Sequence, residues 1–282
     1  MRNQTTIRRE VGLKGVGLHS GSEVEIWLCP SKADSGIRFL ADGGGESEAF
    51  SVTPMAVSST ERGTVLRGAN GDEIRTVEHL LAACYGLRID NLLVRVRGGE
   101  IPAADGSSLP FVHLLLEAGQ ALLPEVRRVA APSSPIWVAD GDACLVALPS
   151  SNLEVTFAVS YPFVGSQLAS FVMDPDSFVS DLAPARTFGF RHEADQIHAA
   201  GLAQGANLDN VLLVDERGYS SPLRFPDELA RHKILDLLGD LALTRADLQC
   251  RILAVKSGHR LNNQLARAIF SQIETGGCDV NA

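Results

Sequence analysis

Segments with the periodicity of strands and of helices follow one another in the same order in both halves of the chain, strands first and helices later. In the first half, residues 22–30 and 91–97 alternate polar and apolar side chains, which predicts strands with one buried face. Apolar residues recur at helical spacing over 76–86 and 109–121. Because a doubly wound sheet would alternate single strands and helices, this order favours an α+β fold with the helices gathered on one face of a sheet.

The second half repeats this order. We expect strands at 143–148, 152–159 and 251–256 and helices at 226–243 and 261–274. The first two of these strands are expected to pair with each other around the Pro-Ser-Ser turn at 149–151. Thr76 and Asp227 stand at positions where their side chains would cap the helices that follow them.

Proline and serine interrupt the pattern at 125–135 (EVRRVAAPSSP), between the two halves. Such a break predicts a linker that separates an N-terminal domain at 1–124 from a C-terminal domain at 136–282. A chain of 282 residues is long enough for two such domains. The halves share no strict sequence repeat, so an internal duplication would be visible only in the structure.

Charge and cysteine content narrow the classes of partner. The 25 Lys and Arg residues against 34 Asp and Glu residues give a formal charge of −9, and no basic run exceeds Arg127-Arg128, which disfavours nucleic acid. A few local cations can still bind a small anionic substrate. Five cysteines without a CxxC pair predict neither a disulfide framework nor a cysteine-rich zinc site, and they fit the reducing cytoplasm. No apolar run reaches the length of a membrane span, so we expect neither export nor integral membrane association.

The expected helix at 226–243 carries His232, Asp236 and Asp240 at successive i, i+4 positions, so the three side chains project from one stripe. Leucines and an isoleucine supply the apolar side of this helix, and we therefore expect the polar stripe to face a cleft or solvent beside the core. By itself an HxxxD pattern more often marks a surface ion pair than a metal site.

Glu78 and His79 stand near the start of a different helix, where a carboxylate and an imidazole can both reach into a groove. A catalytic zinc commonly takes three nitrogen and oxygen ligands from the protein and leaves one position for water. His79, His232 and Asp236 meet that demand, and the same donors accept Zn²⁺ or Fe²⁺. Glu78 is not a ligand in this arrangement, and we expect it to take the proton from the attacking water.

His259 follows the expected strand at 251–256 on a turn that contains glycine (KSGH). Functional side chains are common at such places, although an exposed turn histidine is the simpler interpretation. If His259 enters the cleft, its imidazolium can protonate a leaving amine or stabilise an oxyanion. Asp240 lies one helical turn beyond Asp236 and can hold that ring in its charged form.

Seven short segments stand in one order along nearly the whole chain: 15–21 (GVGLHSG), 76–83 (TVEHLLAA), 86–91 (GLRIDN), 105–107 (DGS), 185–190 (ARTFGF), 231–240 (RHKILDLLGD) and 256–259 (KSGH). As an ordered set they resemble the bacterial UDP-3-O-acyl-N-acetylglucosamine deacetylases (the LpxC family) of lipid A biosynthesis. The resemblance implies two similar domains, each a β-sheet packed against a pair of helices, with the active site between them. It also implies a zinc-dependent, cytoplasmic hydrolysis of the 2-acetamido group on a UDP-linked, 3-O-acylated glucosamine, which releases acetate and commits the product to lipid A.

The resemblance assigns roles residue by residue. The zinc ligands would be His79, His232 and Asp236 and the general base Glu78, in agreement with the chemistry of these side chains. It further implies His259 as general acid or electrostatic stabiliser, Asp240 as its orienting partner, Thr187 as a hydroxyl that helps to polarise the substrate carbonyl, and Lys233 as a substrate contact.

A βαβ-like insert, here at about 191–215, is also implied by the resemblance, and it would form an apolar passage for the 3-O-acyl chain. Its expected lining residues are Phe188, Ala200, Leu202 and Leu208, with Leu18 beside the acyl path. Burial of each CH₂ contributes about 0.8 kcal/mol, so the length of the passage can select chain length. His192 and His198 lie in the insert and are expected at the surface rather than as ligands.

Four further positions follow from the resemblance. His19 in the glycine-rich turn is expected near the cleft, Tyr161 against uracil, Lys256 on the UDP phosphates, and Asp105 as structural support. The sequence departs from the family's pattern at Gly63, where some relatives carry a cysteine near the metal, so no thiol from this loop can occupy the open position. It also departs at 160–163 (SYPF), where relatives often have an aromatic residue followed by Asn-His-Pro.

Two other functions stay open at this point. A metal-dependent lyase or dehydratase would use the same ligands with Glu78 as a base on carbon, but a paired base and acid suit amide hydrolysis better. A catalytically silent, zinc-stabilised binding module would need a fourth protein ligand, and Cys84 is the only cysteine near a proposed ligand. For the enzyme, the expected assembly is a monomer that acts on a small UDP-acyl-sugar.

Overall fold

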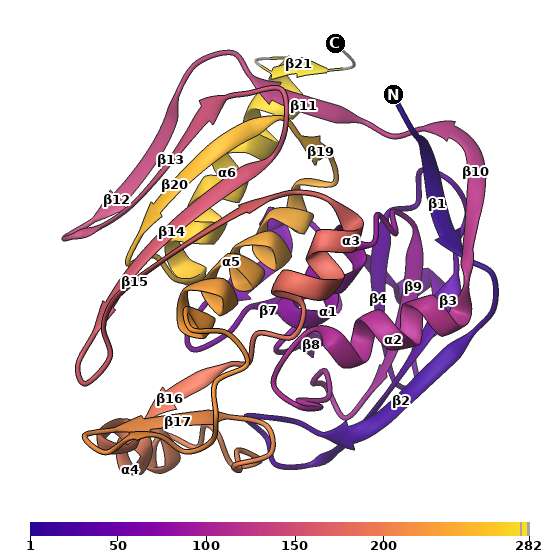
Figure 1. The fold of residues 1–282 in the computed structure, drawn as a ribbon. Helices are drawn as coiled ribbons and strands as arrows, with labels where there is room; N and C mark the ends of the chain where they lie inside the picture. Colours follow the sequence, from indigo (N-terminus) through magenta and orange to yellow (C-terminus); the bar gives the residue numbers. More distant parts are fainter. Residues whose placement is uncertain (277, 281–282) are drawn as a thin grey trace.

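Two five-stranded sheets with the same strand order form the body of the protein, one in each half of the chain (Figure 1). The structure, a computed structural model, describes residues 1–276 and 278–280. The first sheet consists, in spatial order, of β2 (Val11–Val16), β3 (Glu23–Pro30), β9 (Leu92–Arg97), β4 (Ile37–Ala41) and β5 (Phe50–Ser51). The second consists of β12 (Ile136–Asp140), β13 (Ala143–Pro149), β20 (Cys250–Val255), β14 (Glu154–Tyr161) and β15 (Gly165–Val172).

Strand directions in the two sheets also correspond. The third neighbouring pair is parallel in each sheet, β9 with β4 and β20 with β14, whereas the other pairs are antiparallel. The halves therefore share one topology, which the sequence does not reveal as a repeat. The predicted α+β fold with two similar halves is confirmed.

Helices from both halves lie between the two sheets, whereas one helix belongs to a smaller insert. The described residues form α1 (Glu78–Gly86), α2 (Leu109–Ala118), the short α3 (Pro175–Ser177), α4 (Arg191–Ala199), α5 (Glu228–Leu241) and α6 (His259–Thr275). Turns of 3₁₀ or π type stand at Glu46–Glu48, Pro54–Ala56, Phe178–Leu182 and Ala242–Thr244. Helices α5 and α6 cover one face of the second sheet, and α1 packs against α5 (Figure 1). Helix α5 is consequently buried on nearly every side, with only Arg231 and Lys233 partly exposed.

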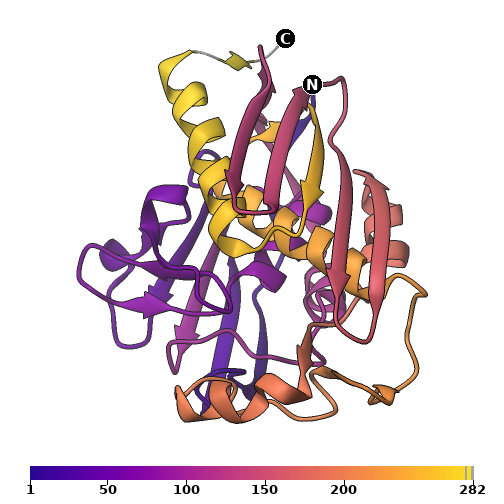
Figure 2. The ribbon, with the colours of Figure 1, turned by 90° about the vertical axis from the view of Figure 1, so that its left-hand side faces the viewer.

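Each half carries a small three-stranded sheet inserted before the helix that holds the expected ligands. The first insert consists of β6 (Val57–Ser59), β7 (Val65–Arg67) and β8 (Glu73–Ile74) and precedes α1. The second consists of β16 (Phe188–Phe190), β17 (Leu212–Asp215) and β18 (Gly218–Tyr219) and precedes α5. Because β16 and β17 are parallel and α4 connects them, the predicted βαβ-like element is present. It lies at the bottom of the molecule in Figures 1 and 2, beside the N-terminal strands.

The predicted pairing of the strands at 143–148 and 152–159 is wrong. Strand β20 lies between β13 and β14, antiparallel to the first and parallel to the second. The turn at 149–151 therefore does not close a hairpin. Alternation identifies a strand with one buried face, but the partner of that strand is set by contacts with distant segments.

Several helix ends differ from the sequence-based expectation. Thr76 has a φ of 57° and its hydroxyl donates to Glu100 Oε1 at 2.9 Å, so it does not cap α1. Asp227 stands at the N-cap of α5, but its carboxylate accepts from Arg231 Nε at 2.7 Å rather than from a backbone N–H. Helix α2 ends at Ala118 because Gly119 adopts a φ of 69°, which glycine tolerates.

The segment predicted as a linker is largely extended. Strand β10 (Gln120–Val126) pairs with β1 (Asn3–Ile7), and β11 (Val129–Pro132) pairs with β19 (Asp247–Leu248) and β21 (Cys278–Val280). Residues 125–135 thus run from strand pairing in the first half to strand pairing in the second half. The division into domains at 1–124 and 136–282 stays a prediction.

Candidate active site

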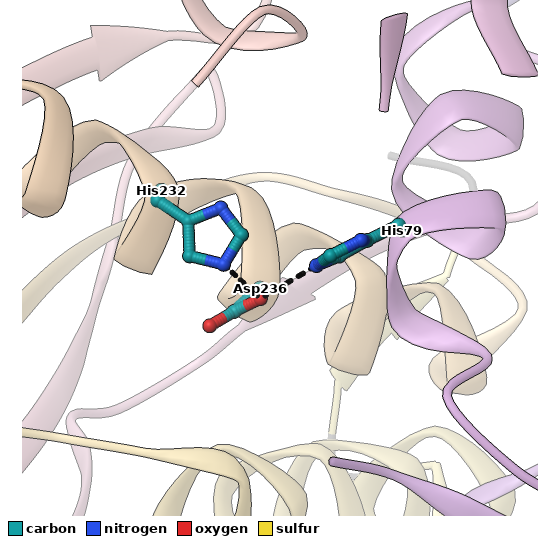
Figure 3. Close-up of side chains that lie close together, drawn as sticks. All are labelled: His79, His232 and Asp236. Atoms are coloured by element: carbon teal, nitrogen blue, oxygen red, sulfur yellow. Dashed lines mark ion pairs between the residues drawn. The ribbon is translucent and has the colours of Figure 1, made fainter. Parts of the chain in front are cut away.

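Two histidines and one carboxylate meet where α1 packs against α5. Figure 3 shows His79 on α1 facing His232 and Asp236 on α5. Their nearest donor atoms all lie within 4.8 Å of one another. Asp236 Oδ1 is 3.3 Å from His232 Nε2 and 3.6 Å from His79 Nε2. All three side chains are buried, so the predicted stripe on α5 faces the other half of the protein rather than solvent.

The donor atoms of this cluster are prepared for a cation. Asp236 Oδ2 accepts from Lys233 Nζ at 2.7 Å, whereas the buried Oδ1 has no hydrogen-bond partner among the described residues. His232 Nδ1 lies 3.1 Å from the carbonyl oxygen of Ala185, which directs the lone pair of Nε2 towards Asp236. Buried oxygens without a partner are rare, and a divalent cation between these three donors would supply one. We conclude that the residues present fit a metal ion.

Protonation states favour metal binding as well. Burial lowers the pKa of His232 to about 4, which leaves the imidazole neutral at pH 7. Burial alone would raise the pKa of Asp236, but the positive charges of Lys233 and His259 hold it well below its ordinary value. A neutral imidazole and an ionised carboxylate are the forms that bind a metal.

Glu78 is the first residue of α1 and directly precedes His79. Its Oε2 accepts from the backbone N–H of Thr64 at 3.0 Å, and its Oε1 lies 3.8 Å from His259 Nε2. The close approach of α1 and α5 depends on Gly239, where a Cβ would lie 2.2 Å from the carbonyl oxygen of Glu78. Glycine on α5 therefore brings the carboxylate of Glu78 within reach of the metal cluster.

His259 also borders the cluster, at the start of α6 rather than on the predicted turn. Its Nδ1 is 3.0 Å from Asp240 Oδ2, and its Nε2 is 3.8 Å from Asp236 Oδ2. Burial would lower the pKa of His259, but the carboxylates of Asp240, Asp236 and Glu78 raise it to about 9. The ring is therefore a stable imidazolium at pH 7 with Nε2 directed towards the cluster.

The raised pKa of His259 predicts a pH-dependent stability of the metal-free protein. A histidine titrates near 6.5 when unfolded, whereas this imidazolium keeps its proton up to a pKa of about 9. The stabilisation, up to about 3 kcal/mol, is complete below pH 6.5 and is lost as the pH rises through 9. We expect urea unfolding at pH 7 and pH 9.5 to show this loss in the wild type and a smaller one in His259→Gln. Equal losses in both proteins would contradict the assignment.

A polar cleft opens beside the cluster. It is lined by the two α5 ligands and His259, by the predicted catalytic Thr187, and by the predicted substrate residues Lys233, Tyr161, Phe188 and Lys256. The ring of Tyr161 lies 5.3 Å from that of Phe188 and 5.3 Å from that of Phe190, edge-on to the first. Lys256 Nζ forms an ion pair with Asp142 at the rim. The structure thus brings these residues to one cavity, and their individual roles stay predictions.

A second, apolar cavity adjoins the polar cleft and shares Thr187, Phe188 and Phe190 with it. Residues of the insert line most of it, including Ala194, Ile197, Leu208 and Val211, and Leu18 and His19 close one side. The N–H groups of Gln204 and Gly205 donate to the carbonyls of His19 and Leu18, which joins the insert to the glycine-rich turn. Of the predicted lining, Ala200 and Leu202 lie outside this cavity. His192 and His198 are exposed, each at the margin of a cavity.

Gly63 and His19 stand close to the base. A Cβ at Gly63 would lie 3.0 Å from Glu78 Oε1 and 3.6 Å from His19 Nε2, so position 63 does border the site. His19 Nε2 is buried and has no hydrogen-bond partner among the described residues. Asp105 forms an ion pair with Arg224 at 2.9 Å and accepts from the N–H of Ser107, in keeping with a structural role.

Three residues around Asp240 were not singled out from the sequence. Thr64, Asn262 and Asn263 all donate to its carboxylate. The two asparagines follow His259 by three and four positions, so they lie on the next turn of the same helix. This spacing is the one feature of the sequence that could have indicated them. The sequence does not indicate Thr64, because it lies in a loop far from Asp240 along the chain.

The chain is similar in sequence to known proteins. A family model described as UDP-3-O-acyl N-acetylglycosamine deacetylase (LpxC) matches residues 4–271. The chain is 38% identical over 274 residues to the UDP-3-O-acyl-N-acetylglucosamine deacetylase of Leptospira biflexa, covering 96% of this chain and 91% of that protein. It is 40% identical to the protein of the same name from Oleidesulfovibrio alaskensis, with 96% and 90% covered, and 39% identical to that from Phenylobacterium zucineum, with 95% and 94% covered. Within the described part of the chain, no helix has the length and apolarity needed to span a membrane.

Proposed function

Because this chain belongs to the UDP-3-O-acyl N-acetylglycosamine deacetylase family, we propose that it hydrolyses the 2-acetamido group of UDP-3-O-acyl-N-acetylglucosamine. The products are acetate and UDP-3-O-acyl-glucosamine, and the reaction commits the sugar to lipid A. The observation that carries the proposal is the buried Asp236 Oδ1, which lies between two imidazoles and accepts no hydrogen bond from the described residues, with a carboxylate base and an imidazolium close to each other nearby. A cytoplasmic monomer is part of the proposal, and five cysteines without a CxxC pair support the reducing compartment.

The metal in this proposal is Zn²⁺, with Fe²⁺ as the alternative that the same donors accept. His79 Nε2, His232 Nε2 and Asp236 Oδ1 would hold it. When bound, the ion supplies Lewis acidity that polarises the acetamide carbonyl and lowers the pKa of the attacking water. Lys233 occupies the other carboxylate oxygen of Asp236 and so leaves Oδ1 for the ion.

Glu78 and His259 divide the proton transfers between them. Glu78 takes a proton from water as the water oxygen adds to the carbonyl carbon. Its Oε2 accepts from the backbone N–H of Thr64, which leaves Oε1 free to take that proton. The imidazolium of His259 stabilises the oxyanion and donates to the amide nitrogen as the C–N bond breaks. The hydroxyl of Thr187 donates to the carbonyl oxygen. Acetate and a free amine result, and no oxidant or further reactant is required.

The two adjoining cavities suit the two ends of the substrate. Lys233 and Lys256 supply ammonium groups in the polar cleft for the sugar and the diphosphate, and Tyr161 offers an aromatic face for uracil. The apolar cavity of the insert receives the 3-O-acyl chain. Thr187 and Phe188 line both cavities, which supports a position of the reacting acetamide between them.

Ala194→Leu is expected to shorten the range of acyl chains that the enzyme accepts. Ala194 lines the apolar cavity from α4, where leucine retains high helix propensity. Three added carbons displace two to three CH₂ groups of a long chain, each worth about 0.8 kcal/mol, so kcat/KM for long-chain substrates falls on the order of 10-fold or more. Substrates with short acyl chains should change less than about 3-fold. Equal losses for long and short chains would show that the acyl group lies elsewhere.

Product identification tests the proposed reaction. Purified protein loaded with Zn²⁺ should convert UDP-3-O-acyl-N-acetylglucosamine to one acetate and one amine per substrate consumed. A lyase acting through the same base would give an unsaturated sugar and no acetate. A silent binding module would bind the metal and give neither product.

A further inference from the structure

Thr64 lies between the base and the acid of the proposed site without lining either cavity. It directly precedes β7 and is wholly buried. Its backbone N–H donates to Glu78 Oε2 at 3.0 Å, and its carbonyl accepts from the N–H of Val77 at 3.4 Å. Both hydrogen bonds connect Thr64 to the start of α1. The N–H bond also occupies the oxygen of Glu78 that faces away from His259.

The side chain of Thr64 reaches the other half of the site. Its hydroxyl donates to Asp240 Oδ1 at 2.6 Å, a short distance for a bond to a charged acceptor. Asn263 Nδ2 lies 3.2 Å from the same carboxylate oxygen and 3.3 Å from Thr64 Oγ1. The hydroxyl therefore has a fixed donor direction, because Asn263 occupies its acceptor side.

Asp240 is held by donors on both oxygens. Oδ1 accepts from Thr64 and Asn263, and Oδ2 accepts from Asn262 Nδ2 at 2.9 Å and from His259 Nδ1 at 3.0 Å. Four donors fill the acceptor capacity of a carboxylate, so neither oxygen can rotate without breaking a bond in a fully buried place. The orientation of His259 is thereby tied to Thr64 through Asp240.

We propose that Thr64 is a positioning residue that sets the separation between the general base and the general acid. Its backbone fixes Glu78 and its hydroxyl fixes Asp240, which in turn fixes the ring of His259. The two groups come from different halves of the fold, and within the described part of the chain Thr64 is hydrogen-bonded to Glu78 and to Asp240 alike. The catalytic consequence rests on the proposed deacetylation, whereas the geometric link does not.

Thr64→Val and Thr64→Ser test the hydroxyl separately from the packing. Valine keeps the shape and the backbone bond to Glu78 but removes the donor to Asp240, so we expect kcat to fall on the order of 10- to 100-fold. KM and bound Zn²⁺ should change less than about 3-fold, because Thr64 lines neither cavity. Serine keeps the hydroxyl and should retain kcat within about 3-fold. Thr64→Ala serves in place of valine if the valine variant does not fold.

Thr244→Val is the matched control. Thr244 is also wholly buried, and its hydroxyl donates to the carbonyl of Leu241 at 2.7 Å, outside both cavities. This variant should lose thermal stability without losing kcat. If Thr64→Val keeps wild-type kcat, or if Thr64→Ser is as slow as Thr64→Val, the hydroxyl does not position the acid and the proposal is overturned.

A readout without turnover separates this proposal from the proposed function. In Zn²⁺-loaded protein with ¹⁵N-labelled histidine, the Nδ1 proton of His259 is expected far downfield because it is bonded to a buried carboxylate, and His259→Gln assigns the signal. Thr64→Val should shift or broaden it and Thr64→Ser should preserve it. An unchanged signal in Thr64→Val overturns the link to Thr64. An inactive wild type with the expected signal changes would overturn the proposed function and leave the positioning role standing.

Discussion

Glu78→Gln is expected to lower kcat for acetamide hydrolysis by about 10²- to 10⁴-fold while the protein still binds one equivalent of Zn²⁺. Glutamine keeps the size of the side chain and can accept the backbone N–H of Thr64, but its amide cannot take a proton from water. Glu78 directly precedes His79 but does not belong to the three donors, so its replacement separates proton transfer from metal binding. Acetate release and metal content are measured on the same preparation.

The control for this experiment is Glu61→Gln. Glu61 lies in the same 60–64 loop region as Gly63 and Thr64, is exposed, and lines neither cavity. It should retain wild-type kcat. Full activity in Glu78→Gln would remove the base from the mechanism, and loss of bound metal in that variant would place Glu78 among the ligands instead.

The double variant His79→Gln with Asp236→Asn is expected to lose metal and activity together. Each substitution roughly preserves side-chain size but removes one of the three donors, so only His232 on α5 remains. A catalytic site of three ligands tolerates no such loss, so we expect Zn²⁺ affinity to fall by more than about 10³-fold. Metal content after dialysis and acetate release both check this prediction.

His113→Gln is the matched control for the metal experiment, because His113 is an exposed histidine on α2, outside both cavities. It should bind one equivalent of metal and turn over normally. Equimolar Zn²⁺ retained by the double variant would mean that the ion is held elsewhere. In that case the lack of a hydrogen-bond partner for Asp236 Oδ1 among the described residues would need another explanation.

The parts of the site that could be predicted are those carried by one element. The i, i+4 spacing on α5 placed His232, Asp236 and Asp240 on one stripe, and the structure keeps that stripe together. It was expected at a cleft or in solvent; His232 and Asp236 do line the polar cleft, although all three residues are buried where the two halves meet. The apolar periodicity of α5 predicts its contact with the sheet of its own half. It does not predict that α1 of the other half packs against its polar stripe.

Pairing and capping could not be predicted for related reasons. Strand β20 enters between β13 and β14 from about a hundred residues later in the chain, which a local alternation cannot encode. The hydroxyl of Thr76 donates to the distant Glu100, and the carboxylate of Asp227 accepts from Arg231 one turn along α5, so neither side chain forms the expected cap. Thr64 was missed in the same way, because its importance arises only where loop, α1 and α5 meet.

The most direct measurement is stepwise addition of Zn²⁺ to metal-free wild-type protein, with acetate release from UDP-3-O-acyl-N-acetylglucosamine followed after each addition. If His79, His232 and Asp236 hold the catalytic ion, acetate release starts near zero, rises in proportion to added metal and stops rising at one equivalent. Undiminished acetate release before any metal is added, or one bound equivalent with no acetate formed, would contradict the proposed metal centre and its reaction.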